Sequence, residues 1–304
     1  MTQLLALVGP TASGKTHIAT GIAAALGAEV VCADSMTVYR EMDVGTAKPD
    51  REARARVRHH LLDIADPAQA FSVAEFQRQA RGVLADLQVR GRRALVVGGS
   101  GLYFRAVVDD LSFPPTDPAV RERLEAESLE VLASRLAVED PAAAGFVDAA
   151  NRRRVVRALE VIELTGRRFS DFRGEWSRFR PIPVAGLHVE ADVLDVRIRA
   201  RLRAMLSQGF LEEVRGLVAR GYRGSLTASR AVAYPQALAH LDGVTSADEF
   251  VEDVVRATKR LARRQNSWFR RDPRIRWFDA VDLEHASGEV RAYYEREMQG
   301  ENGA

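Results

Sequence analysis

Eight residues near the start of the chain have the types and spacing that hold a polyphosphate. Residues 9–16 read GPTASGKT, which fits the pattern G-x-x-x-x-G-K-[ST] between an apolar run and a helical stretch. In such a loop the backbone amides point at phosphate oxygens, the lysine adds a positive charge, and the last hydroxyl can ligate Mg²⁺. The motif does not say which diphosphate is bound. The residues expected to bind it are Gly9, Thr11, Ala12, Ser13, Gly14, Lys15 and Thr16, with Thr16 also the expected Mg²⁺ ligand.

Polar residues also follow two other apolar runs. Asp34 comes directly after the run 29–33, and Ser100 lies between glycines after the run 93–97. If these runs are parallel strands, their carboxyl ends meet the phosphate-binding loop at one crevice, where ligands of such sheets bind. Asp34 could be a carboxylate associated with Mg²⁺, a general base for an incoming nucleophile, or a helix cap. Ser100 could offer its hydroxyl to a ligand or cap a helix.

The elements predicted around these residues follow the order of a parallel α/β sheet. Strands are predicted at 4–8, 29–33 and 93–97, with helices at 15–26, 73–88 and 102–108. Residues 113–185 are predicted to be a helical insertion, before a fourth strand at 184–189 and helices at 196–208, 210–220, 231–241 and 250–269. The sequence therefore predicts an α/β fold of the P-loop NTPase type. Its parallel sheet, flanked by helices, is expected in residues 1–112 and 186–304, with an inserted all-helical domain at 113–185.

Positive charge is concentrated in two segments, although the whole chain is almost balanced. With 44 basic and 42 acidic residues, the net charge is +2. Residues 151–180 hold nine arginines against four acidic residues, and residues 256–276 hold eight arginines and Lys259 against Asp272 alone. Either segment alone could be a solvated helical face, but the two together favour a nucleic acid as partner. Trp268 and Phe269 in the second segment could stack on a base or belong to the core.

Composition excludes several other classes of protein. A chain that is 46% hydrophobic and 28% charged is neither disordered nor fibrous. With one cysteine, Cys32, it can form neither an internal disulfide nor a multi-thiolate zinc site. No stretch approaches the roughly 18 apolar residues of a membrane span, and the first ten residues lack the pattern of a signal peptide. We therefore expect a cytoplasmic protein without membrane contact. A monomer is the expected state, although none of these features determines it.

Motifs along nearly the whole chain resemble those of the tRNA dimethylallyltransferase family. Besides the phosphate-binding loop, they include DVGTAKP at 43–49, VGGSGLY at 97–103, RALEV at 157–161 and RRQ at 263–265. The resemblance implies transfer of a dimethylallyl group from dimethylallyl diphosphate to the exocyclic amine of the adenine immediately 3′ of a tRNA anticodon. Diphosphate would be the leaving group, Mg²⁺ the cofactor and the tRNA anticodon stem-loop the partner. The zinc finger of the eukaryotic relatives is absent from this sequence.

The resemblance also assigns roles to individual residues. Asp34 would accept the proton of the adenine amine, with Ser100 beside it in place of the usual threonine. Because departing diphosphate gains negative charge, an arginine is the expected stabiliser. Arg201 is our candidate, with Arg197 one helical turn away as a second. The residues expected to contact tRNA are Asp34, Ser35, Met36, Thr37, Ser100, Arg121, Arg153, Arg154, Arg157, Arg230, Arg264 and Gln265.

One stretch departs from the pattern of this family. The family generally has a glycine where Ala233 stands and a basic residue after Tyr234, so a phosphate or base contact here could be missing.

Two other functions are alternatives to prenyl transfer. The main alternative is a P-loop kinase acting on a small hydroxylated metabolite, which would consume ATP. A non-catalytic RNA-binding module would tolerate the loss of Lys15, Thr16 and Asp34.

Overall fold

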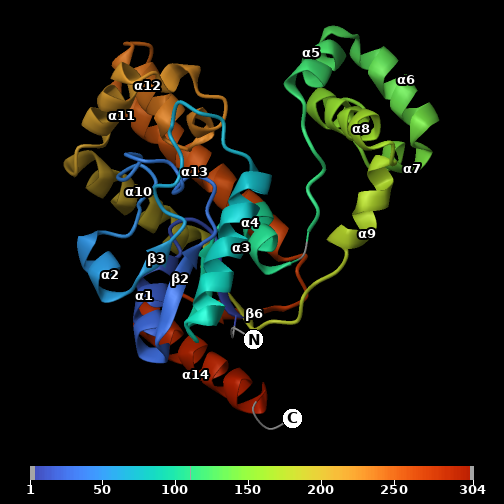
Figure 1. Ribbon diagram of the computed structural model, residues 1–304. Helices are drawn as coiled ribbons and strands as arrows, with labels where there is room; N and C mark the ends of the chain where they lie inside the picture. Colours follow the sequence, from blue (N-terminus) through green and yellow to red (C-terminus); the bar gives the residue numbers. More distant parts are fainter. Residues whose placement is uncertain (1–3, 110, 302–304) are drawn as a thin grey trace. The chain divides into compact units, whose positions relative to one another are not determined.

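The computed structural model describes residues 4–109 and 111–301, which divide into two compact units (Figure 1). The sheet unit contains the described residues up to Val108 and from Pro181 onward, and the inserted unit contains Asp109–Arg180. Both junctions lie a few residues before the boundaries expected at 113 and 185. None of the helices described is long and apolar enough to cross a membrane.

The sheet unit is built on six parallel strands. They are β1 (Leu4–Val8), β2 (Ala28–Cys32), β3 (His59–His60), β4 (Arg93–Gly98), β5 (Val184–His188) and β6 (Ile275–Asp279), in the order β3-β2-β4-β1-β5-β6. The central strand β1 pairs with β4 through Leu5 and Leu95, and with β5 through Ala6 and Val184. Both faces of β1 are buried, which explains why it reads as a continuous apolar run.

The sequence did not predict the two outer strands. The edge strand β3 has only two residues, both histidines, which is too short to form a pattern. The other edge strand, β6, reads IRWFD and lies at the end of the second arginine-rich segment, where its charge masked its extended conformation. The four predicted strands are confirmed to within about one residue at each end.

Helices cover both faces of this sheet. They are α1 (Lys15–Leu26), α2 (Arg51–Arg56), α3 (Val73–Val89), α4 (Gly101–Val108) and α14 (Leu283–Glu301). Helix α1 packs against α14, and α3 packs against α4 (Figure 1). The alanine-rich sequence of α1 lets its backbone come close to the strands. Neither α2 nor α14 was predicted from the sequence.

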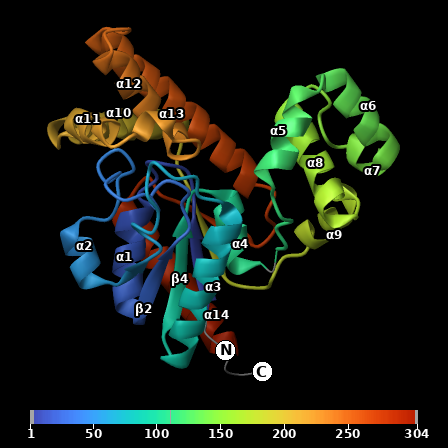
Figure 2. The same cartoon turned by 45° about the horizontal axis from the view of Figure 1, so that its top comes forward.

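A second group of helices lies at one end of the sheet (Figure 2). It consists of α10 (Ala191–Ser207), α11 (Phe210–Ala219), α12 (Tyr234–Leu241) and α13 (Ala247–Phe269), which pack against one another. Helix α13 begins three residues before its predicted start because Ser246 and Glu249 form a capping box. Helix α12 begins three residues later than predicted because Ala233, with φ 81°, interrupts helical geometry.

The described residues of the inserted unit form helices and loops but no strand, and the unit has a core of its own. Its helices are α5 (Pro118–Ala126), α6 (Leu129–Glu139), α7 (Pro141–Ala144), α8 (Arg152–Thr165) and α9 (Arg173–Trp176), with a 3₁₀ turn at Phe169–Phe172. Leu124, Leu132 and Leu159 are among its fully buried residues. Two arginines converge on the buried carboxylate of Glu160, Arg121 at 2.8 Å and Arg157 at 2.7 Å. Burial opposes ionisation of Glu160, but these two partners hold its pKa below the usual value.

Candidate active site

A cavity of about 420 Å³ lies in the sheet unit at the carboxyl ends of β1, β2 and β4. Its wall includes residues 11–16 of the phosphate-binding loop, the segment after β2, glycines 98 and 99, and side chains from α10 and α13. This is the edge of a parallel α/β sheet at which ligands bind. The structure therefore brings six of the seven predicted diphosphate-binding residues and Asp34 to one cavity, whereas Gly9 is outside its lining.

The phosphate-binding loop contains residues with positive φ angles, a backbone conformation that few residues adopt. Ala12 has φ 62° and Gly14 has φ 87°, and the latter directly precedes the first turn of α1. The Lys15 ammonium donates to the carbonyl of Pro10 at 2.5 Å. Burial lowers the pKa of Lys15 to about 8, with the negative charge of Asp34 opposing and the positive charge of Arg201 adding to this shift. The loop thus offers backbone amides and a partly buried lysine to a phosphate group.

Thr11 connects this loop to two helices. The guanidinium of Arg201, on α10, donates to the Thr11 hydroxyl at 3.0 Å. The Thr11 backbone N–H donates to the side-chain oxygen of Gln265, on α13, at 2.8 Å. Burial lowers the pKa of Arg201 from its usual high value, against the attraction of Asp34, and the group remains charged at neutral pH. Arg197 lies elsewhere, since it donates to the carbonyl of Val281 at 2.8 Å and does not line this cavity.

Asp34 is half-buried and faces the cavity. One oxygen of its carboxylate, Oδ1, accepts from the backbone N–H of Met36 at 2.8 Å, which closes a local turn. No helix follows within the described residues before α2, so helix capping does not explain this carboxylate. Met36 and Thr37 line the same cavity, whereas Ser35 is adjacent but outside its lining. The segment after β2 therefore presents one carboxylate and two further side chains to a ligand.

Ser100 lies at the position expected for a helix-capping residue. It directly precedes α4, and its carbonyl accepts from the N–H of Phe104 at 2.8 Å. The cavity is lined by Gly98 and Gly99 but not by Ser100. An added Cβ at Gly99 would lie 2.5 Å from the Gln265 amide nitrogen, so the glycine leaves room for the Gln265 side chain in its present position.

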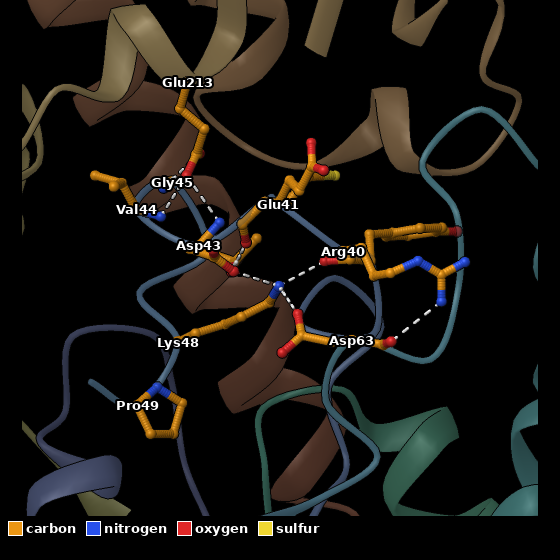
Figure 3. A network of polar contacts seen from close by, with 12 residues as sticks. Arg40, Glu41, Asp43, Val44, Gly45, Lys48, Pro49, Asp63 and Glu213 are labelled. Carbon is orange, nitrogen blue, oxygen red and sulfur yellow. Dashed lines mark hydrogen bonds and ion pairs between the residues drawn. The ribbon is translucent and has the colours of Figure 1, made fainter. Parts of the chain in front are cut away.

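The DVGTAKP segment, for which the sequence predicted no function, forms a further wall of the cavity. Gly45, Thr46 and Ala47 line the cavity. The Glu213 carboxylate accepts from the backbone N–H groups of residues 43, 44 and 45 at 2.8, 2.7 and 3.1 Å (Figure 3). The hydroxyl of Tyr234 donates to the same carboxylate at 2.7 Å.

Lys48 fixes the other end of this segment. Its ammonium is almost completely buried and donates to Asp43 and Asp63, both at 2.6 Å, and to the carbonyl of Tyr39 at 2.5 Å (Figure 3). Sequence reasoning could have suspected a structural site here, because Lys48 is one of only three lysines in an arginine-rich chain. A compact, three-donor ammonium fits three converging oxygens better than a planar guanidinium does.

The remaining residues expected at tRNA lie at several places. Arg230 and Arg264 are exposed on the sheet unit, and neither side chain pairs with another described residue. Gln265 faces the cavity instead of solvent. In the inserted unit Arg153 and Arg154 are exposed on α8, while Arg121 and Arg157 bind Glu160. Of the aromatic residues left open, Phe269 is fully buried and Trp268 packs against Gly101.

These features define the class of protein. A parallel sheet whose first strand leads through a G-x-x-x-x-G-K-T loop into a helix is the fold of the P-loop proteins, here with an inserted helical unit. The family model for IPP transferase matches residues 37–272. The chain belongs to the IPP transferase family.

Individual relatives agree with this assignment. The chain is 48% identical over 289 residues to a tRNA dimethylallyltransferase of Bifidobacterium animalis subsp. lactis, covering 92% of this chain and 83% of the relative. A tRNA dimethylallyltransferase of Kineococcus radiotolerans is 50% identical, with 92% and 91% covered. The crystal structure of a tRNA isopentenylpyrophosphate transferase from Bacillus halodurans is similar with a TM-score of 0.74 at 36% identity, covering 100% and 99%. A eukaryotic dimethylallyltransferase acting on tRNA shares the fold, with a TM-score of 0.82 at 22% identity, covering 93% and 75%.

Proposed function

We propose that this protein transfers a dimethylallyl group from dimethylallyl diphosphate to the exocyclic amine of the adenine immediately 3′ of a tRNA anticodon, and releases diphosphate. The observation that carries the proposal is the cavity in which the phosphate-binding loop, Arg201 and Asp34 come together. Curated relatives of about half-identical sequence bear the name of this activity. The same observations give no support to a kinase over a prenyltransferase.

The reaction breaks one bond and forms another at the same carbon. The bond between the allylic carbon and the diphosphate oxygen breaks, a bond between that carbon and the adenine nitrogen forms, and the amine loses one proton. We assign that proton to the Asp34 carboxylate, whose Oδ2 accepts from no other described residue. Lys15 and Arg201 stabilise the charge that develops on the departing diphosphate, and because both are partly withdrawn from water their charges are less screened than on an open surface.

The residues present also fit a Mg²⁺ ion carried largely by the substrate. Within residues 4–109 and 111–301, no three His, Cys, Asp or Glu side chains gather into a metal-binding group. Mg²⁺ in phosphate sites keeps several waters and needs only one or two protein ligands besides phosphate oxygens. Thr16, exposed on the first turn of α1, lines the same cavity and would hold it. When bound, the ion neutralises negative charge on the diphosphate.

Binding of tRNA requires positive charge outside the cavity, which exposed arginines supply. On α13 and the turn that follows it, the guanidinium groups of Arg260, Arg263, Arg264, Arg270 and Arg271 pair with no other described residue. Arg230 is exposed near the amino end of α12, and Arg153 and Arg154 are exposed on α8 of the inserted unit. We propose that these arginines bind backbone phosphates of the anticodon stem-loop, while the adenine leaves its stack to enter the cavity. The protein would act as a monomer in the cytoplasm.

A two-tube experiment tests the proposal. Purified protein with Mg²⁺ is given unmodified tRNA and labelled dimethylallyl diphosphate in one tube, and labelled ATP with the same tRNA in the other. We expect label to enter tRNA from the prenyl donor alone. A matched tRNA with guanine at the position 3′ of the anticodon should stay unlabelled. ATP turnover without prenyl transfer would refute the proposal and favour a kinase.

A further inference from the structure

Helix α13 presents two chemically different faces. Val254, Thr258, Leu261 and Gln265 recur at helical spacing and line the cavity. Arg256, Arg260, Arg263 and Arg264 lie on the exposed side of the same helix. Gln265 thus follows directly after two exposed arginines in the sequence, but its own side chain lines the cavity.

The amide of Gln265 lies between two loops at the carboxyl ends of neighbouring strands. Its oxygen accepts from the Thr11 N–H at 2.8 Å, in the loop after β1. Its nitrogen lies so close to Gly99, in the turn after β4, that an added Cβ there would be only 2.5 Å away. A single side chain therefore bonds to the phosphate-binding loop and lies against the glycine turn.

Thr11 makes this contact relevant to diphosphate. The same residue accepts a hydrogen bond from Arg201 through its hydroxyl, so Gln265 and Arg201 hold Thr11 from two directions. The next residue, Ala12, has φ 62°, a conformation that an alanine keeps only when its neighbours are fixed. Loss of the Gln265 acceptor would leave the Thr11 N–H without its partner and release the point on which Arg201 depends.

We propose that Gln265 is a positioning residue for the diphosphate, acting through Thr11, and that it does not bind tRNA. This inference rests on the proposed function, and it replaces the expectation that Gln265 contacts tRNA. A neutral amide suits this place, because a carboxylate would repel the diphosphate and an aliphatic side chain would offer no acceptor.

The test separates the affinity for diphosphate from the affinity for tRNA. Gln265→Met keeps the length of the side chain and removes its polar atoms. Binding of inorganic diphosphate with Mg²⁺, measured by calorimetry without tRNA, should weaken about tenfold or more. The KM for dimethylallyl diphosphate should rise similarly, while the tRNA dissociation constant and the melting temperature stay near those of the wild type. The neighbouring Arg264→Ala serves as the matched control and should show the reverse, with weaker tRNA binding and unchanged diphosphate binding.

A second variant keeps the inference falsifiable if Gln265→Met does not fold. Gln265→Asn retains the amide but shortens its reach by one methylene group, and it should lose diphosphate affinity in the same way. Unchanged diphosphate affinity together with weakened tRNA binding in the folded variant would overturn the inference. The diphosphate measurement needs no turnover. If diphosphate affinity depends on Gln265 but the wild-type protein does not prenylate tRNA, only the proposed function is refuted.

Discussion

Replacing Asp34 with asparagine removes the proposed base and leaves the local turn intact. In the wild type Oδ1 accepts from the Met36 N–H at 2.8 Å, and Oδ2 is available to the adenine amine. The asparagine oxygen can keep the bond to Met36, while its nitrogen takes the place of Oδ2 and cannot accept a proton. Asp34→Ala would also lose the turn, so asparagine is the cleaner substitution.

The size of the effect follows from the role of the carboxylate. A positioned general base typically contributes about 10²- to 10⁴-fold to a rate, which corresponds to about 3–5 kcal/mol of barrier. We therefore expect the single-turnover rate of prenyl transfer to fall by that factor in Asp34→Asn. The diphosphate-binding contacts made by Lys15 and Arg201 do not involve this oxygen, so affinities for diphosphate and tRNA should stay within about twofold of the wild type.

The assay is rapid quench of enzyme in excess over labelled tRNA, at saturating dimethylallyl diphosphate. It reports the chemical step without product release. A decrease of less than about tenfold would refute the assignment of Asp34 as the base. Equal losses of rate and of tRNA affinity would assign Asp34 to binding instead.

Three further predictions concern stability and tRNA affinity. The hydrogen bond from Arg90 lowers the pKa of Glu29, burial opposes this shift, and a hydrogen bond from His60 adds to it, so that the pKa is about 2 instead of 4.5. Glu29→Gln should therefore lose about 3 kcal/mol of unfolding free energy above pH 5, a deficit that disappears as the pH falls towards 2, and denaturant titrations at several pH values that show no such trend would contradict it. Ala233→Gly should relieve the backbone at φ 81° and raise the free energy of unfolding by about 1 kcal/mol, seen as a melting temperature higher by about 2–4 °C; a lower one would contradict it. Arg264→Ala should weaken tRNA binding and reduce the slope of log Kd against log [salt] by about one unit. An unchanged slope would exclude a phosphate contact by Arg264.

Those parts of the fold that rest on local pattern could be predicted from the sequence. The phosphate-binding loop is defined by the spacing of its glycines, lysine and threonine between a strand and a helix. The central strands are buried on both faces, so residues 4–8 form a continuous apolar run. Strand β6 could not be found in this way, because Arg276 and Trp277 are partly exposed at the sheet edge and interrupt its pattern. The same limit explains α14, whose packing against α1 is a tertiary contact.

The sequence could also not tell one arginine from another. Arg154 and Arg157 lie on the same helix and were both expected at tRNA, but only Arg157 is close enough to donate to Glu160 and to the carbonyls of residues 114 and 115. Gln265 is a similar case, since the residue type is polar and its neighbours are basic. Which side of a helix a residue faces depends on the register of α13 against the loops, and that register is set by contacts distant in the sequence.

The position of β1 in the sheet has a consequence for how the protein is made. Strand β1 is completed by β5, which begins at Val184, so its edge has no partner until the whole inserted unit has left the ribosome. The inserted unit has its own core of Leu124, Leu136 and Leu159 and closes on contacts within a short stretch of chain, which favours early folding. The order of synthesis therefore places the inserted unit first and closure of the sheet last. Helix α13 is synthesised later still, so the phosphate-binding loop leaves the ribosome long before Gln265 does. A chain truncated before α13 would therefore be inactive.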